Sequence, residues 1–316
     1  MEKEKKILLK KDFNKLGIPL LIQQLLLFLT VLVLAIGWMI TKFFENPTMD
    51  EESINGLANS LASNGTIMIV AVLIAFIPII IFRKDKFFHY DLKIKNKPIN
   101  FKIIILSFAI VLGINFLSGV LSELLESLLN LFGLTSAPSQ EALSGDITIS
   151  MVLYVCIIGP FFEEFLYRGA ILRYLEKYGA RFAIVTSAIL FGFMHGNIIQ
   201  IPFAIIIGII FGFLAKEYSI KLSIIIHMAN NTYAEIFNYF STSIDESIIN
   251  TLYLGIAIPC VILIIVLLVT KRNSIKDWLQ NNKIEKKMLL SFFTSITVVI
   301  ILIYNIITTC FGIARL

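Results

Sequence analysis

The chain has 316 residues, of which 57% are hydrophobic and only 16% are charged, and its mean hydropathy is +0.85. Such a composition excludes an ordinary water-soluble domain. The net charge of +5 does not indicate a nucleic-acid partner, because the basic residues are confined to short segments between apolar stretches. These segments hold 25 of the 27 Lys and Arg residues and comprise 1–15, 83–102, 168–181, 216–221 and 271–287.

Apolar stretches long enough to cross a bilayer recur along the whole chain. About 20 apolar residues in a helix cross roughly 30 Å of hydrocarbon. The stretches that meet this pattern are 16–41, 66–82, 102–121, 147–166, 182–196, 198–215, 219–239, 251–270 and 288–310. Only the turn around Gly196 and Asn197 divides the fifth from the sixth. We therefore expect an all-α, polytopic membrane protein with eight to nine transmembrane helices.

Charge alternates between successive connecting segments. The segments 45–65, 122–146 and 240–250 are acidic and hold no Lys or Arg, whereas those on the other side are basic. By the positive-inside rule, this alternation predicts a multi-pass protein of the cell membrane with a cytoplasmic N-terminus. Nine spans would place the C-terminus outside.

Three regions are expected along the chain. Residues 1–100 form an N-terminal membrane hairpin with basic ends, 101–240 a core, and 241–316 the C-terminal membrane helices. Within the core, leucines in 122–146 recur at helical spacing until Gly133. This segment either lies along the outer interface or extends the third span. The cysteines all lie inside apolar segments, so no disulfide framework is expected.

Two adjacent carboxylates, Glu163 and Glu164, follow an apolar run at the end of the fourth span. A charge at the centre of a membrane helix costs roughly 2.5–3.5 kcal/mol, so ionisable residues there indicate function. Pro160 has no N–H to donate to the carbonyl of Cys156, so the helix is expected to loosen one turn before Glu164. Loosened backbone at this depth is tolerated where it lines a wet cavity.

The two carboxylates are expected to differ in role. Glu164 and Arg168 are four residues apart in the favourable order, which predicts an ion pair. Glu163 lies about 100° away on the helix and has no cation close in sequence on its own face. It is therefore the candidate general base.

The fifth and seventh spans supply the other polar groups. His195 follows Phe191 by one turn, and Gly192 and Gly196 would let another helix approach there. His227 and Asn231 share one helical face and are candidate donors to an oxyanion. Each pattern alone is weak, but three successive elements with inward polar groups predict one shared site.

Taken in order, Glu163-Glu164-x-x-x-Arg168, Phe191-x-x-x-His195 and His227-x-x-x-Asn231 resemble the CAAX protease and bacteriocin-processing (Abi) family. This is a family of intramembrane endopeptidases that includes the type II CAAX prenyl endopeptidases. The resemblance implies that Glu163 activates a water with help from His195, inside an intramembrane catalytic cavity. It further implies that His227 and Asn231 stabilise the oxyanion, and that Glu164 and Arg168 support the site.

The expected activity is hydrolysis of a peptide bond in a membrane-associated protein or peptide, near the cytoplasmic face. No cofactor is favoured, although Glu163, His195 and His227 could alternatively bind one zinc ion. Two other functions remain open. One is a non-catalytic bacteriocin self-immunity protein, and the other is a proton-coupled transporter. Many such transporters are built from inverted repeats, and the sequence shows no such repeat.

Overall fold

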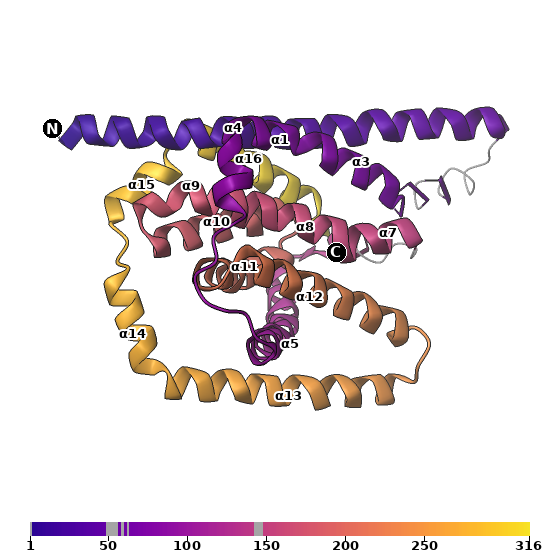
Figure 1. Cartoon of the computed structure of the whole chain (residues 1–316). Coiled ribbons are helices and arrows are strands. Elements are labelled where there is room, and N and C mark those ends of the chain that lie inside the picture. The colour runs from indigo at the N-terminus through magenta and orange to yellow at the C-terminus, as the bar shows by residue number, and fades with distance from the viewer. Residues whose placement is uncertain (1, 49–55, 58–59, 62, 142–147) are drawn as a thin grey trace.

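The computed structural model describes residues 2–48, 56–57, 60–61, 63–141 and 148–316, and this part of the chain is almost entirely helical (Figure 1). The elements in the first half are α1 (Glu2–Glu45), α3 (Gly65–Ala75), α4 (Ile77–Arg83), η1 (Phe87–Asp91), α5 (Phe101–Leu131), β1 (Leu134–Thr135), α6 (Ala137–Glu141), α7 (Ile149–Leu153) and η2 (Tyr154–Ile158). Those of the middle are α8 (Gly159–Glu164), η3 (Phe165–Leu172), α9 (Arg173–Leu175), η4 (Glu176–Tyr178), α10 (Ala180–Met194), α11 (Gln200–Glu217) and α12 (Ile220–Ser241). The last are α13 (Glu246–Thr270), α14 (Arg272–Asn281), α15 (Lys286–Phe293), α16 (Ile296–Phe311) and β2 (Ala314–Arg315).

Six helices in the described part of the chain are long and apolar enough to cross a membrane. They are Lys6–Glu45, Gly65–Arg83, Phe101–Leu131, Ile149–Tyr178, Gln200–Glu217 and Glu246–Thr270. A seventh candidate is the pair α15 and α16, which is bent by 67°. The expectation of an all-α polytopic membrane protein is confirmed.

The predicted number of eight to nine spans is higher than this count. The predicted fifth span is α10, which is apolar but only 15 residues long. The predicted seventh span is α12, whose His227, Asn230 and Asn231 lower its hydropathy. The predicted ninth is broken between α15 and α16. The predicted start of the fourth span at 147 lies outside the described residues.

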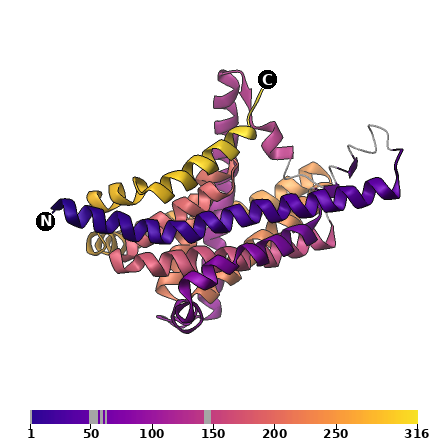
Figure 2. The same cartoon turned by 90° about the horizontal axis from the view of Figure 1, so that it is seen from above.

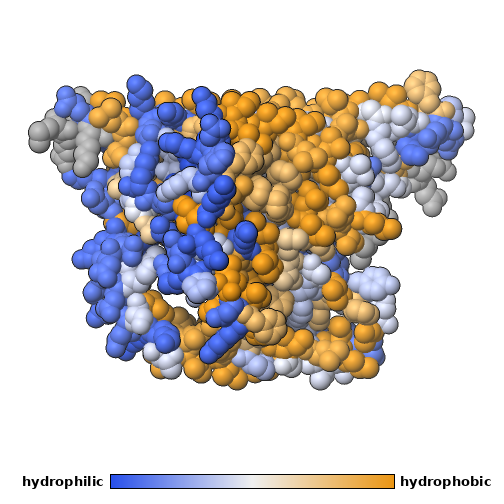
Figure 3. All heavy atoms as spheres, in the orientation of Figure 1, coloured by the Kyte–Doolittle hydropathy of each residue, from blue (hydrophilic) through white to orange (hydrophobic). Residues whose placement is uncertain are grey.

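The helices are arranged with α1 and α13 along opposite edges of the molecule, while α5 is seen end-on between them (Figure 1). Seen from above, α5 crosses the direction of α1 (Figure 2). Apolar side chains form a broad band across the middle of the molecule, and hydrophilic ones gather at the end where α1 begins and α14 lies (Figure 3). This segregation agrees with a membrane setting, and the basic end is the one that the charge pattern assigns to the cytoplasm.

The main apolar core joins elements from distant parts of the sequence. The ring of Phe13 in α1 lies 5.9 Å from that of Phe182 in α10 and 5.2 Å from that of Phe292 in α15. All three rings are fully buried. The first and last helices therefore pack directly on the helices that hold the polar site.

The segment after the third span extends that span, which was one of the two expected alternatives. The helix α5 continues to Leu131 and ends before Gly133, whose φ of +70° is one that glycine adopts readily. The chain then pairs β1 with β2 in antiparallel register, with Leu134 opposite Arg315. This short sheet fixes the C-terminal strand beside the end of α5.

Candidate active site

The helix that carries the two glutamates is interrupted twice. Two π-helical segments, η2 and η3, flank the single α-helical segment α8 that ends at Glu164. The predicted loosening before Glu164 is therefore confirmed. Single π-helical turns inside α-helices occur frequently at functional sites, because they turn side chains out of regular register.

The π register changes which carbonyl lacks a backbone partner. In a π-helix each carbonyl pairs with the amide five residues on, as Tyr154 does with Gly159. The carbonyl opposite Pro160 is then that of Val155, and not that of Cys156 as expected for an α-helix. Pro160 has no N–H, and instead the Nδ2 of Asn231 donates to the Val155 oxygen at 3.0 Å.

Glu164 is completely buried and is held by three side chains. Arg168 donates from Nη1 to its Oε1 at 2.8 Å, which confirms the predicted ion pair. The Nδ1 of His227 lies 2.9 Å from the same oxygen, and Ser223 donates to Oε2. A buried charge is tolerated when it is paired and hydrogen-bonded in this way.

Arg168 is also completely buried, in an aromatic surrounding. Its Nη2 donates to the carbonyl of Gly208 in α11 at 3.2 Å. Its guanidinium carbon lies 4.3 Å from the ring centre of Phe191 and 5.4 Å from that of Phe211. These distances are those of cation–π contacts, which arginine makes readily through its planar, weakly hydrated group. Arg168 thereby ties the glutamate helix to both α10 and α11.

Glu163 differs from its neighbour in being accessible. Its side chain retains 24% of its exposure, and its Oε2 lies 3.6 Å from the Nε2 of His227. His227 itself is almost fully buried and lies between the two carboxylates, with one ring nitrogen toward each. A carboxylate only accepts hydrogen bonds, so the proton of Nδ1 faces Glu164. The Nε2 side of the ring then faces Glu163 and the open part of the site.

His195 lies directly after the end of α10 and is half-buried. Its Nδ1 lies 2.9 Å from the carbonyl oxygen of Phe191, an acceptor, so that nitrogen carries the proton and Nε2 is left for the site. The ring of Phe191 contacts both histidines, with centre distances of 4.9 Å to His195 and 5.8 Å to His227. Close packing of α11 on Gly192 holds this end of α10 in place.

Three polar residues of the site were not predicted. Ser223 binds Glu164, and Asn115 donates to Asn230, which in turn donates to Asn231, at 2.7 and 3.2 Å. Ser223 precedes His227 by four residues, so its helical face could have identified it. Asn230 lies beside Asn231 in the sequence, but its role depends on a hydrogen bond from Asn115 of α5. No local sequence pattern indicates that Asn115 belongs to the site.

The donor groups do not support the alternative of a zinc ion. Throughout the described residues, no group of three or more His, Cys, Asp or Glu side chains is placed to hold a metal ion. The proposed ligands Glu163, His195 and His227 therefore do not fit a tetrahedral zinc site in this structure, since zinc needs three converging protein ligands in a catalytic site.

The fold and this cluster define a polytopic helical membrane protein with a charge-paired, buried site and one accessible carboxylate. Residues 145–233 match the protein family described as "Type II CAAX prenyl endopeptidase Rce1-like". This segment includes all six predicted site residues. This part of the chain is thus similar to the CAAX protease family, as its motifs indicated, and the match supports endopeptidase activity in general. No curated protein and no solved structure matches the chain.

Proposed function

We propose that this protein is an intramembrane endopeptidase that hydrolyses a peptide bond of a membrane-associated protein or peptide with a water activated by Glu163. The observation that carries the proposal is the contrast between the two adjacent glutamates. Glu164 is buried and fully occupied by partners, whereas Glu163 is accessible and lies beside a fixed histidine. An accessible carboxylate beside an oriented imidazole is the arrangement that general base catalysis requires.

The roles of the other residues follow from their contacts. Glu163 takes a proton from the attacking water, and His195 assists from its free Nε2. Asn231 and His227 stabilise the oxyanion of the tetrahedral intermediate, His227 donating from Nε2 when its ring carries both protons. Glu164 and Arg168 do not touch the substrate in this proposal. They hold the ring of His227 in the orientation that the reaction needs.

The test is cleavage of a library of membrane-anchored peptides by the purified full chain and by Glu163→Gln. Glutamine keeps the size of the side chain but cannot accept the proton, so we expect the rate to fall by about two to four orders of magnitude. Glu123→Gln is the matched control. Glu123 is exposed on α5, so this substitution removes the same charge at a position away from the site. Equal rates for both variants and the original chain would contradict the proposal.

A chelator provides a second arm of the same experiment. Because the donor groups do not form a metal site, we expect 1,10-phenanthroline to leave the rate unchanged. Loss of activity with the chelator, restored by added zinc, would replace the glutamate-activated water by a metal-bound one. A non-catalytic immunity protein would instead retain its full cellular effect in Glu163→Gln.

A further inference from the structure

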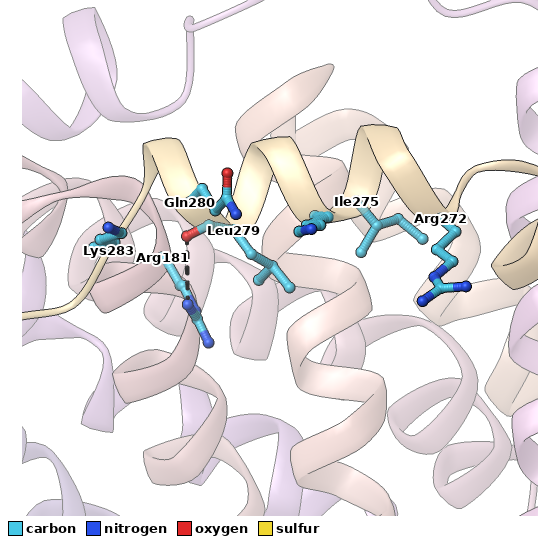
Figure 4. Close-up of a pocket in the computed structure, with 7 residues that line it drawn as sticks. Arg181, Arg272, Ile275, Leu279, Gln280 and Lys283 are labelled. Atoms are coloured by element: carbon cyan, nitrogen blue, oxygen red, sulfur yellow. Dashed lines mark hydrogen bonds between the residues drawn. The ribbon is translucent and has the colours of Figure 1, made fainter.

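A basic groove lies at the hydrophilic end of the molecule, and none of the predicted site residues lines it. It is an open hollow of about 360 Å³ between the start of α10 and one face of α14 (Figure 4). Its lining consists of Arg181, Arg272, Ile275, Lys276, Leu279, Gln280 and Lys283. All but Arg181 come from one face of α14 and the residues just after it, since they recur every three or four positions.

The groove collects four cations and no carboxylate. Arg181 crosses from α10 and donates a long hydrogen bond from Nη1 to the carbonyl of Leu279 at 3.5 Å. Among the described residues, Arg272, Lys276 and Lys283 make no ion pair. Four cations lining one hollow repel each other unless an anion joins them, so the groove is complementary to a negatively charged group.

The surroundings of the groove are those of a membrane interface. The helix α14 follows directly on α13, an apolar helix that can span the membrane. On the side of α14 next to the groove, Trp278 packs on Phe213 of α11, with ring centres 5.8 Å apart. Within the groove, Ile275 and Leu279 remain more than a third exposed, so apolar surface lies beside the cations. A basic amphipathic helix that carries a tryptophan is typical of helices lying in the interface.

We propose that this groove binds the phosphate headgroup of an anionic phospholipid in the leaflet at the basic end of the protein. Basic pockets between helices on the cytoplasmic side are suited to such headgroups, and arginine in particular matches the geometry of phosphate. The exposed Ile275 and Leu279 contact the glycerol backbone and the first carbons of the acyl chains. A free phosphate ion would use the cations but not these apolar side chains, so both features together select a lipid.

Bound lipid adds contacts between α10 and α14. The phosphate contacts Arg181 on α10 and the cations of α14 at the same time, in addition to the single hydrogen bond to Leu279. The proposal is independent of the catalytic one, because none of these residues contacts Glu163 or His227.

The experiment uses the fluorescence of Trp278 in the full chain. The protein has two tryptophans, so a Trp38→Phe background leaves Trp278 as the sole reporter. Phosphatidylglycerol with brominated acyl chains is titrated into the detergent-solubilised protein, and quenching gives the affinity. We expect phosphatidylglycerol to quench at concentrations at least tenfold lower than brominated phosphatidylcholine. The triple variant Arg272→Gln, Lys276→Gln and Lys283→Gln should abolish this preference, since each cation near the surface contributes about fivefold in affinity.

The matched control carries Lys84→Gln, Lys86→Gln and Lys93→Gln. These exposed lysines lie in another basic segment, so the net charge changes equally while the groove is intact. The control should retain the preference for phosphatidylglycerol. Equal quenching in both triple variants would overturn the proposal, and so would equal affinity for the two lipids in the original groove. Displacement of the lipid by glycerol 1-phosphate at similar concentration would show a site for free phosphate instead of lipid.

Discussion

The Nδ2 of Asn231 donates a hydrogen bond to the carbonyl oxygen of Val155 at 3.0 Å, across the interface between α12 and the glutamate helix. The carbonyl is available because its partner in the π register is Pro160, which has no N–H. A side chain of the site thus replaces a missing backbone donor. The same bond orients the carboxamide of Asn231 and fixes α12 against the helix that carries Glu163.

The first prediction concerns the coupling between Pro160 and Asn231. Asn231→Ala leaves the Val155 carbonyl unpaired, at a cost of about 1–3 kcal/mol in the free energy of unfolding. In a Pro160→Ala background the new amide can bind that carbonyl, so the same substitution should cost about 1 kcal/mol less. A double-mutant cycle from unfolding in detergent measures this difference. Strictly additive costs would show that the two residues act independently.

The second prediction concerns the buried pair Glu164 and Arg168. Arg168→Met leaves Glu164 buried without a fixed cation and should lower the free energy of unfolding by about 3–5 kcal/mol. Adding Glu164→Gln removes the unpaired charge and should restore part of this loss. Lys42→Met serves as the control, because Lys42 pairs with Glu45 on the surface and should contribute no more than about 1 kcal/mol. If the double variant is less stable than Arg168→Met, the charge pairing is not the cause.

The third prediction is kinetic and concerns Ser223. Its hydroxyl donates to Glu164, which orients His227, so Ser223→Ala should lower kcat about tenfold and leave KM nearly unchanged, since a hydrogen bond to a charged group contributes about 1.5–3 kcal/mol. Ser187→Ala is the matched control. Ser187 is equally buried but donates only to the backbone carbonyl of Ile184. Equal kcat values for the two variants would argue against a positioning role for Ser223.

The fourth prediction concerns the close approach of α10 and α11 at Gly192. A Cβ there would lie about 3.0 Å from the carbonyl oxygen of Ile201 and would also meet the side chain of Ile205. We therefore expect Gly192→Ala to destabilise the protein by about 1–3 kcal/mol, as overpacking does. A Cβ added at Gly37 in α1 would meet no other atom within 4 Å. Gly37→Ala should therefore stabilise the protein by about 0.5–1 kcal/mol. Thermal unfolding of both variants checks the pair.

Residues that interact within one helical turn could be predicted from the sequence. The ion pair of Glu164 with Arg168, the loosened backbone before Glu164 and the close packing at Gly192 depend on local spacing or on residue size. The apolar segments were found for the same reason, since hydropathy is a local property. The predicted number exceeds the six or seven candidates in the described residues, because α10 is short and α12 carries polar residues, features that a hydropathy pattern does not separate from a full span.

Contacts between distant helices could not be predicted in the same way. The approach of Asn115 to Asn230 depends on how α5 packs on α12, which no local pattern specifies. An α-helical register places the orphan carbonyl at Cys156, and one extra residue in the turn moves it to Val155. Likewise, the position of His227 between two carboxylates depends on the packing of distant helices, which no local pattern specifies.

The π-helical segment Tyr154–Ile158 also allows the length of this helix to vary by one residue between related sequences. A π turn holds one residue more than the regular helix around it, so a deletion there could be absorbed as an ordinary α-helical turn. The residues that precede it would then keep nearly their present orientation relative to Glu163. Ile149, now 90% exposed, would stay on the same surface of the helix. Loss of one residue within Tyr154–Ile158 is therefore expected to leave the position of Glu163 unchanged, whereas loss of one residue from the α-helical segment Gly159–Glu164 would rotate Glu163 by about 100°.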